Sequence, residues 1–301
     1  MKVLALINAS AGAVERETPD LFRERLAATF AAQGVDAELE VVTGGQIRDA
    51  AARARDRATA HEVDAIAVGG GDGTIRTLAS VLAGTGVPLG LLPTGTLNHF
   101  ARDLGIPADL DSAVAVIAGG RTRAVDVAEV NGEVFVNNSS IGIYPYMVLD
   151  RERRRSLHGL TKWTAMALAA VRTLRYLPLR RLSIRAGDQD DAYRTPCVFV
   201  GNNEYDLTMP ALGRRARLDE GELCLYVARP QGRLSLLWLA LRAGLGLVRE
   251  TRDLRKLRGT AAEISSRTSR LPVALDGEVE RLRPPLRYRI RPQALRVFVP
   301  E

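Results

Sequence analysis

Short apolar runs alternate with stretches of helical periodicity along residues 1–120, and this alternation limits the fold more than any other feature of the chain. The apolar runs lie at residues 3–7, 35–42, 65–68 and 89–92, with helix-like sequence between them. Strands that alternate with helices build a parallel sheet, because each parallel connection has to cross over the sheet. This part of the chain therefore predicts a doubly wound α/β domain.

The pattern changes after residues 119–120 to short β-like segments. Asn131 and Gly132 separate the first two, at 125–130 and 134–136. An Asn-Gly pair favours a hairpin because both central residues of such a turn need a positive φ. Further strands are predicted at 182–186, 197–200, 223–227, 262–264, 273–275 and 295–299.

Two helical stretches, 160–177 and 234–257, interrupt these predicted strands. We therefore expect an α/β domain at residues 1–124 and an antiparallel β domain at 125–301. The final strand packing back on the first domain is left as an open alternative. No flexible linker separates the two parts, so we expect close packing with a ligand cleft between them.

The composition is that of a globular protein, with 46% hydrophobic and 26% charged residues, which excludes intrinsic disorder. Two cysteines, Cys197 and Cys224, provide neither a disulfide framework nor a set of zinc ligands. The longest apolar stretch, 234–248, is interrupted by Arg242, and the chain enters its first strand without the pattern of a signal peptide. We expect a soluble cytoplasmic protein.

Arginine dominates the basic residues, because only three of the 42 lysines and arginines are lysines, and the formal net charge is +7. Arginine binds phosphate and carboxylate through two donors at once, which favours an acidic partner such as a nucleotide or an anionic lipid surface. An equally good interpretation is that arginine replaces lysine on solvated surfaces. Aromatic residues make up only 5% of the chain, and no nucleic acid partner is expected.

A glycine-rich turn at residues 69–74, Gly-Gly-Gly-Asp-Gly-Thr, joins a predicted strand to a predicted helix. Glycines let the backbone approach a ligand closely, and the start of the helix offers free N–H groups to a phosphate. Asp72 could hold a Mg²⁺ ion that bridges phosphate oxygens. The alternative is a tight turn in which Asp72 or Thr74 caps the helix. Neither a Walker A loop nor a dinucleotide fingerprint is present.

Three loops follow predicted strands, at residues 8–12, 69–74 and 94–98. In a doubly wound sheet such loops meet in one crevice at the carboxyl ends of the strands. The predicted nucleotide site therefore comprises Asn8, Ala9, Ser10, Ala11, Gly12, Gly69, Gly70, Gly71, Asp72, Gly73, Thr74, Thr94, Gly95, Thr96 and Asn98.

Near the end of the chain, a predicted strand leads into Asp276-Gly277-Glu278. Phosphoryl transfer to an alcohol needs a carboxylate that orients the hydroxyl and accepts its proton. Asp-Gly is also a common hairpin turn, and that is the simpler interpretation of these residues taken alone.

In their order along the chain, these motifs resemble the diacylglycerol kinase catalytic-domain family, the lipid kinases that include sphingosine kinases. The resemblance rests on residues 70–74, 93–98, 100–102, 104–107, 276–278 and 295–300. It implies a nucleotide-binding α/β domain, a β-sandwich domain, and transfer of a phosphoryl group from ATP, with Mg²⁺, to a lipid hydroxyl such as that of diacylglycerol or a sphingoid lipid.

The resemblance also implies roles for single residues. Residues 8–12 and 69–74, Thr43 and Thr96 would contact ATP, and Glu278 would accept the proton, with Asp276 beside it. Asp126 would lie near the Mg²⁺ network. A second, structural Mg²⁺ is implied around Arg217, Asp219, Glu220 and Glu222, where Glu220 stands in the place of an aspartate. His99 also departs from the family, which usually has an aspartate there.

A lipid substrate implies transient contact with an anionic membrane surface, for instance the inner face of the cell membrane. Arginines at 151–155 precede the predicted helix 160–177, which carries Trp163, and Trp238 lies in the other predicted helix. Core-facing helices with a solvated basic face are the simpler interpretation. A homodimer is one possible state. The alternative functions are a kinase for a soluble acceptor, as in NAD kinases, and a nucleotide- or lipid-binding regulator without catalysis.

Overall fold

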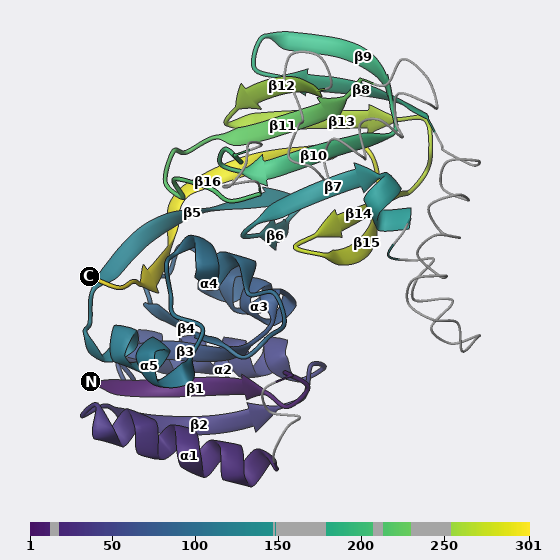
Figure 1. The fold of residues 1–301 in the computed structure, drawn as a ribbon. Coiled ribbons are helices and arrows are strands. Elements are labelled where there is room, and N and C mark those ends of the chain that lie inside the picture. The colour runs from purple at the N-terminus through teal and green to yellow at the C-terminus, as the bar shows by residue number, and fades with distance from the viewer. Residues whose placement is uncertain (13–17, 147, 149–178, 207–212, 230–253) are drawn as a thin grey trace.

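The computed structural model describes residues 1–12, 18–146, 148, 179–206, 213–229 and 254–301 (Figure 1). The predicted helix 160–177 and residues 234–253 of the other one, with the basic stretch 151–155, lie outside the described residues. Within the described part, no helix combines the length and the apolar character needed to cross a membrane.

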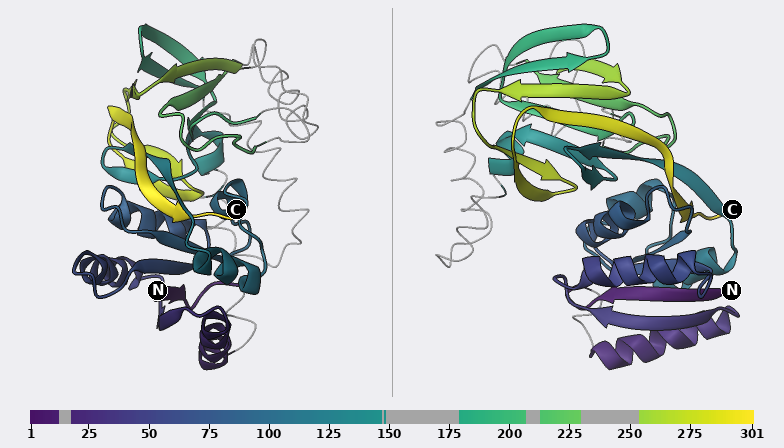
Figure 2. Two further views of the ribbon diagram at one scale, coloured as in Figure 1. Left: turned by 90° about the vertical axis from the view of Figure 1, so that its left-hand side faces the viewer. Right: turned by 180° about the vertical axis from the view of Figure 1, so that it is seen from behind.

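The first lobe is the α/β part of the chain. Its parallel sheet has the order β2-β1-β3-β4, formed by β1 (Lys2–Asn8), β2 (Asp36–Val42), β3 (Ala65–Gly70) and β4 (Leu89–Pro93). Helix α1 (Pro19–Ala32) packs with α5 (Leu110–Ala118), and α2 (Ile47–Thr59) packs with α3 (Asp72–Leu82). The two pairs cover opposite faces of the sheet (Figure 2), which confirms the doubly wound prediction.

Apolar burial explains why these segments form this layer. Val3 to Ile7 of β1 are at most 2% exposed, as expected of a strand covered on both faces. Helix α1 buries Phe22, Leu26 and Phe30 completely, whereas Leu21, part of the same predicted apolar pattern, is 54% exposed. The Thr18 side chain accepts a hydrogen bond from the Leu21 amide and starts this helix.

The second lobe is a β-sandwich. One layer is an antiparallel sheet of order β12-β11-β10-β7-β14-β15, and the facing layer contains β5, β6, β16, β13, β8 and β9. Their bounds are β5 (Thr122–Val130), β6 (Glu133–Phe135), β7 (Asn138–Gly142), β8 (Arg180–Ala186), β9 (Gln189–Thr195), β10 (Cys197–Asn202), β11 (Leu223–Ala228), β12 (Leu254–Gly259), β13 (Ala261–Ser266), β14 (Leu271–Leu275), β15 (Glu278–Leu282) and β16 (Leu286–Phe298). Asn131 and Gly132, at φ 51° and 91°, make the predicted hairpin between β5 and β6.

Strand β16 belongs to both lobes. Its first half pairs with β13, where Tyr288 lies opposite Ala262, and it pairs with β5 along most of its length. Near its end Val297 lies opposite Leu89 of β4, so the sheet of the first lobe and one layer of the sandwich form a single ten-stranded sheet. Figure 1 shows the strand descending from the second lobe to the first.

Some predicted elements differ from the structure. Residues 254–257, predicted as the end of a helix, form part of β12, and this prediction was wrong. Leu257 pairs with Leu225 of β11, so pairing with a distant strand outweighs the local helical pattern. The strand predicted at 295–299 is the end of the much longer β16. Strand β15 and helix α4 (His99–Asp103) were not among the predicted elements.

Candidate active site

Three loops of the first lobe meet at the carboxyl ends of its strands. The Asn8 Nδ2 atom donates a hydrogen bond to Thr74 Oγ1 at 2.9 Å and joins the first loop to the glycine-rich one. A Cβ atom on Gly95 would lie 2.5 Å from the Gly71 Cα atom, so the second and third loops touch backbone to backbone. A side chain at Gly95 would push these loops apart.

The third loop is held in shape by Asn98. This residue adopts a left-handed conformation with φ 49° at the start of α4. Its Oδ1 atom accepts from the Gly95 amide at 3.1 Å, and its Nδ2 atom donates to the Gly95 carbonyl at 2.9 Å. Thr94 is buried, and its Oγ1 atom has no partner among the described residues. Thr96 is exposed at the tip of the loop.

The remaining predicted nucleotide contacts lie along the same edge. The Ala9 amide donates to the Val42 carbonyl, and the Ser10 amide donates to Asn8 Oδ1. Ala11 is buried and Gly12 is exposed. Thr43 follows β2, and its amide and hydroxyl both donate to Gln46 Oε1, at 3.2 and 2.9 Å. The loop residues therefore form a continuous rim of backbone and small side chains.

Asp72 lies at the first position of α3, directly after Gly71, where the helix presents its positive end. Its Oδ1 atom accepts a hydrogen bond from the Phe100 amide in the first turn of α4, at 3.4 Å. Two helix starts thus surround one half-buried carboxylate. Carboxylate oxygens are the ligands that Mg²⁺ prefers, so Asp72 fits the metal-binding role predicted for it.

The Asp276-Gly277-Glu278 turn joins β14 to β15 and is a hairpin turn, with Asp276 at φ 48° and Gly277 at 93°. The Asp276 carboxylate accepts three backbone hydrogen bonds, from Val136 at 2.8 Å, Asn137 at 2.8 Å and Asn138 at 3.0 Å. Burial raises the pKa of Asp276 to about 6, although these amides and Arg76 favour the charged form. Asp276 anchors the turn.

Glu278 reaches from this turn to the glycine-rich loop of the other lobe. A Cβ atom on Gly73 would lie 2.2 Å from Glu278 Oε1, so the carboxylate rests on the glycine backbone. The Glu278 side chain is 62% exposed and is open to a partner from solution. The structure therefore brings together the two motifs that the sequence placed 205 positions apart, at Gly73 and Glu278.

Asp126, predicted near the Mg²⁺ network, and most of the residues predicted around a second cation have partners within the chain. Both Asp126 oxygens accept backbone amides, from Gly221 and Gln293, each at 2.7 Å. Asp219 pairs with Arg123 at 2.9 Å and with Arg217 at 3.3 Å, and the hydrogen bond from Arg123 lowers its pKa. Glu222 pairs with Arg258, and Glu220 is exposed. Arginines pair with Asp219 and Glu222 and backbone amides with Asp126, whereas Glu220 faces solvent, so the second cation stays a prediction.

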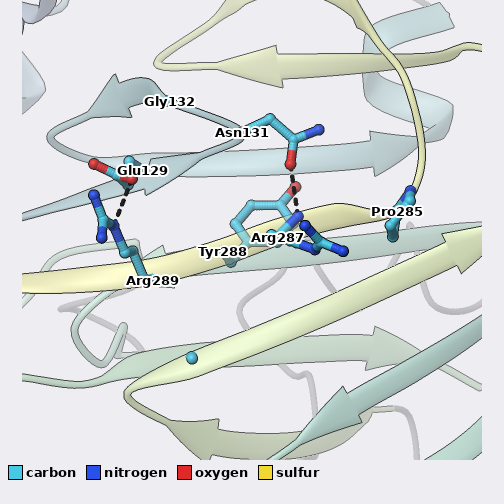
Figure 3. A pocket seen from close by; sticks show the side chains of 8 residues that line it. Glu129, Asn131, Gly132, Pro285, Arg287, Tyr288 and Arg289 are labelled. Carbon is cyan, nitrogen blue, oxygen red and sulfur yellow. Dashed lines mark hydrogen bonds and ion pairs between the residues drawn. The ribbon is translucent and has the colours of Figure 1, made fainter.

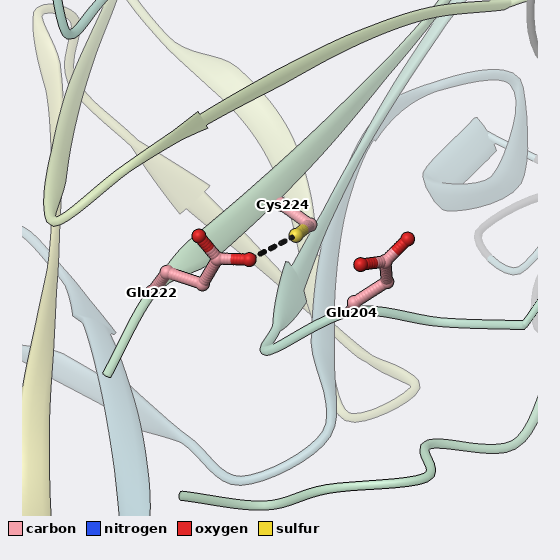
Figure 4. Close-up of side chains that lie close together, drawn as sticks. All are labelled: Glu204, Glu222 and Cys224. Carbon is pink, nitrogen blue, oxygen red and sulfur yellow. Dashed lines mark hydrogen bonds between the residues drawn. The ribbon is translucent and has the colours of Figure 1, made fainter. Parts of the chain in front are cut away.

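His99, which stands where the family usually has an aspartate, contacts the guanidinium group of Arg102. Arg102 Nη2 lies 3.0 Å from His99 Nδ1 within the same short helix. In the described part of the chain, one group of potential metal ligands is Glu204, Glu222 and Cys224 (Figure 4). Lys256 and Arg258 neutralise its two carboxylates, and burial raises the pKa of Cys224 to about 12, which keeps the thiol protonated.

A surface hollow of about 630 Å³ lies on the second lobe (Figure 3). It is lined by Glu129, Asn131, Gly132, Ala261, Pro285, Arg287, Tyr288 and Arg289. None of the predicted site residues contributes to it. Its charged side chains form ion pairs. Arg289, for example, forms an ion pair with Glu129 at 2.6 Å. The predicted cleft between the domains stays a prediction.

Arg76 belongs to the site and was missed from the sequence. It lies one turn after Asp72 on α3, and its guanidinium group faces Glu278 at 3.5 Å. The available signal was a single arginine among the apolar positions Ile75, Leu78 and Ala79, all of them buried. Its partners come from the other lobe, more than 50 residues away, so the pattern alone could not name them.

Comparisons with known proteins agree with this architecture. The family model of the diacylglycerol kinase catalytic domain matches residues 2–130, and that of the YegS C-terminal NAD kinase beta sandwich-like domain matches residues 148–299. A Pseudomonas aeruginosa (PAO1) protein named "Probable lipid kinase YegS-like" is 30% identical over 83% of this chain and 81% of its own length.

A second relative is the Mycobacterium tuberculosis (H37Rv) protein named "Diacylglycerol kinase", 36% identical over 49% of this chain; the match also spans about half of that protein. The crystal structure of a diacylglycerol kinase from Bacillus anthracis str. Sterne covers 99% of this chain and 97% of its own, with a TM-score of 0.69 at 23% identity, a likeness of fold. Fold and sequence thus define a two-lobed protein of the kinase class. The chain belongs to the diacylglycerol kinase catalytic-domain family, a family of lipid kinases.

Proposed function

We propose that this protein transfers the γ-phosphoryl group of ATP to a hydroxyl group of a lipid, such as diacylglycerol or a related glycerolipid or sphingoid lipid. The observation that carries the proposal is the contact between Glu278 and Gly73, because it sets a proton acceptor directly against the loop that would hold the phosphates. Both requirements of phosphoryl transfer to an alcohol then lie in one place.

In this proposal the lipid hydroxyl oxygen attacks the γ-phosphorus, and the bond from that phosphorus to the bridging oxygen of ADP breaks. The hydroxyl proton passes to Glu278, which Asp276 keeps in place through the turn. Amides of residues 69–74 would hold the triphosphate at the start of α3. Mg²⁺ held by Asp72 would neutralise the charge that develops on the phosphate oxygens.

The test uses the purified protein, Mg-ATP labelled in the γ-phosphate, and a total lipid extract, with the labelled product identified by its mass. Parallel reactions offer diacylglycerol, a sphingoid base, NAD and a sugar phosphate. A labelled lipid supports the proposal. Label on NAD or on the sugar phosphate alone contradicts it, and ATP binding without any transfer points to a non-catalytic regulator.

Glu278→Gln is the matching variant. It removes the proton acceptor and keeps the size of the side chain, so we expect the transfer rate to fall by roughly 10²- to 10⁴-fold, with ATP affinity within about threefold. Glu24→Gln, the same change on the exposed face of α1, is the control and leaves the rate unchanged. Equal losses of rate and of ATP affinity in Glu278→Gln contradict the role as a proton acceptor.

A kinase for a soluble acceptor is the second candidate. The observation in its favour is the description of the matching C-terminal family model as NAD kinase beta sandwich-like. The Asp276-Gly277-Glu278 turn and the family of the first lobe favour the lipid acceptor. A lipid acceptor requires transient contact with a membrane surface, which binding to vesicles that contain anionic lipid would measure.

A further inference from the structure

Arg76 is a buried cation at the junction of the lobes. It is 6% exposed and belongs to α3, the helix that begins with the glycine-rich loop. Its Nε atom donates to the Val134 carbonyl at 2.7 Å, and its Nη2 atom pairs with Glu280 at 2.6 Å. All of these partners come from the second lobe. In Figure 1, α3 lies on the side of the first lobe that faces β6 and β15.

The contacts of Arg76 differ in length, and the difference distinguishes the residues that hold Arg76 from the residue that Arg76 orients. Val134 and Glu280 hold the guanidinium group at short distances, whereas Glu133 and Glu278 each lie 3.5 Å away. A buried cation needs a counter-charge, and Glu280 already supplies it. Glu278 is therefore not required to neutralise Arg76. Arg76 instead offers a fixed positive charge to the exposed side chain of Glu278.

Without this cation beside it, the Glu278 side chain would lose its orientation. It is 62% exposed, and an exposed glutamate has several rotamers of similar energy. The contact with Arg76 involves Oε2 and leaves Oε1 against Gly73, where the acceptor hydroxyl would lie. Because Arg76 and Asp72 are four residues apart on one helix, they lie on the same face, and the glycine-rich loop and the Arg76 cation move together.

We propose that Arg76 is a positioning residue for phosphoryl transfer, holding Glu278 against the glycine-rich loop while Glu280 holds Arg76. The inference rests on the proposed function of Glu278. It also explains why an arginine occupies a buried position of α3 between apolar neighbours.

The test is a double-mutant cycle of Arg76→Gln and Glu278→Gln, read as the rate of single-turnover transfer to the lipid acceptor and as the affinity for ATP. In the wild-type background, Arg76→Gln lowers the rate by about 10- to 100-fold, as expected of a misplaced reacting group, and changes ATP affinity by less than about threefold. In the Glu278→Gln background, the same change lowers the rate by less than about twofold. Arg289→Gln, which removes an exposed arginine paired with Glu129, is the control and keeps the wild-type rate.

Equal losses in both backgrounds, or a loss that follows ATP affinity, overturn the inference and make Arg76 a structural link only.

If Arg76→Gln does not fold, Glu280→Gln replaces it. That variant removes the short contact that holds Arg76 and leaves the cation, and its rate falls in the same direction. A second readout needs no activity: a crystal structure of Arg76→Gln or Glu280→Gln has the Glu278 carboxylate away from Gly73. A carboxylate that stays on Gly73 in that structure overturns the inference. A wild-type protein that labels no lipid refutes the proposed function, and the crystal structure then decides the positioning by itself.

Discussion

At the scale of single residues, Asp276 shows how the turn that carries Glu278 is kept in place. A left-handed conformation is strained for a residue with a side chain, and Asp276 adopts it at φ 48°. Three backbone amides from residues 136–138 bind its carboxylate and hold the turn in this conformation. This strained residue lies two positions before Glu278, so the fixed backbone of the turn fixes the position of the proposed proton acceptor.

Asp276 should make stability depend on pH. Burial raises its pKa from the ordinary 3.8 to about 6 in the folded protein, so the folded state takes up a proton more readily than the unfolded state. Its contribution to the free energy of unfolding is therefore complete below about pH 4 and is lost as the pH rises through about 6. Urea denaturation between pH 4 and 7 should show the wild type losing about 2 kcal/mol relative to Asp276→Asn over this range. A constant difference between the two proteins contradicts the prediction.

The residues of the turn could be named from the sequence, but their surroundings could not. Asp276 and Glu278 stand in a recognisable motif. The amides that bind Asp276 belong to Val136, Asn137 and Asn138, about 140 positions earlier, and nothing in those three residues indicates an anion-binding role. Arg76 is hidden for the same reason, since its partner Glu280 lies 204 positions away. Contacts of this range follow from the fold and not from local pattern.

At the scale of elements, the glycines of the loops are not equivalent. Gly95 faces the Gly71 backbone, which cannot give way as the end of a flexible side chain can. Gly73 faces the end of the Glu278 side chain, which is flexible and exposed. The first contact therefore joins two loops, and the second involves the proposed proton acceptor.

This difference gives opposite expectations for two alanine substitutions. Gly95→Ala should lower the free energy of unfolding by about 1–3 kcal/mol and weaken ATP binding, because the added methyl group forces the backbones apart. Gly73→Ala should leave stability nearly unchanged but lower the transfer rate, because the methyl group displaces Glu278. Chemical denaturation, ATP titration and the transfer assay measure the three quantities. Gly44→Ala is the control, since a Cβ atom there meets nothing within 4 Å; similar effects in all three variants contradict the distinction.

The strands of the first lobe were predicted to within a residue or two, because each is a buried run between turn residues. The second lobe was harder. Strand β15 carries Glu278, Glu280 and Arg281, and its polar residues conceal the strand. Residues 254–257 continue a helical pattern and become a strand only through pairing with β11. The loops of the site were predictable because they follow from the ends of well-marked strands.

At the scale of the whole molecule, a buried ion pair joins the lobes on the side of α4. Arg215 and Asp103 are paired at 2.9 Å, and their side chains are 0% and 2% exposed. Arg215 also donates to the Val136 carbonyl and to Asn137 Oδ1, both at 2.7 Å. Asn137 in turn donates its amide to Asp276. One guanidinium group thus connects the helix that follows the third loop with the segment that anchors the turn.

Arg215→Met should therefore be strongly destabilising. It leaves the Asp103 carboxylate buried without a counter-charge, which typically lowers the free energy of unfolding by about 3–5 kcal/mol. Adding Asp103→Leu to it should recover part of the loss, because the uncompensated charge is removed. Denaturation curves of the wild type, the two single variants and the double variant give the coupling between the two residues. A loss below about 1 kcal/mol in Arg215→Met, or strict additivity, excludes the ion pair as a link between the lobes.

Strand β16 has a consequence for how the protein is made. The flank of β4 that faces away from β3 pairs with residues near 297, more than 200 positions after Leu89. An N-terminal half released early would keep that flank bare and ready to pair with another chain. The sheet of the first lobe therefore lacks this neighbour until residues near 297 have been made, and a fragment that ends before Leu286 should aggregate rather than behave as an independent domain.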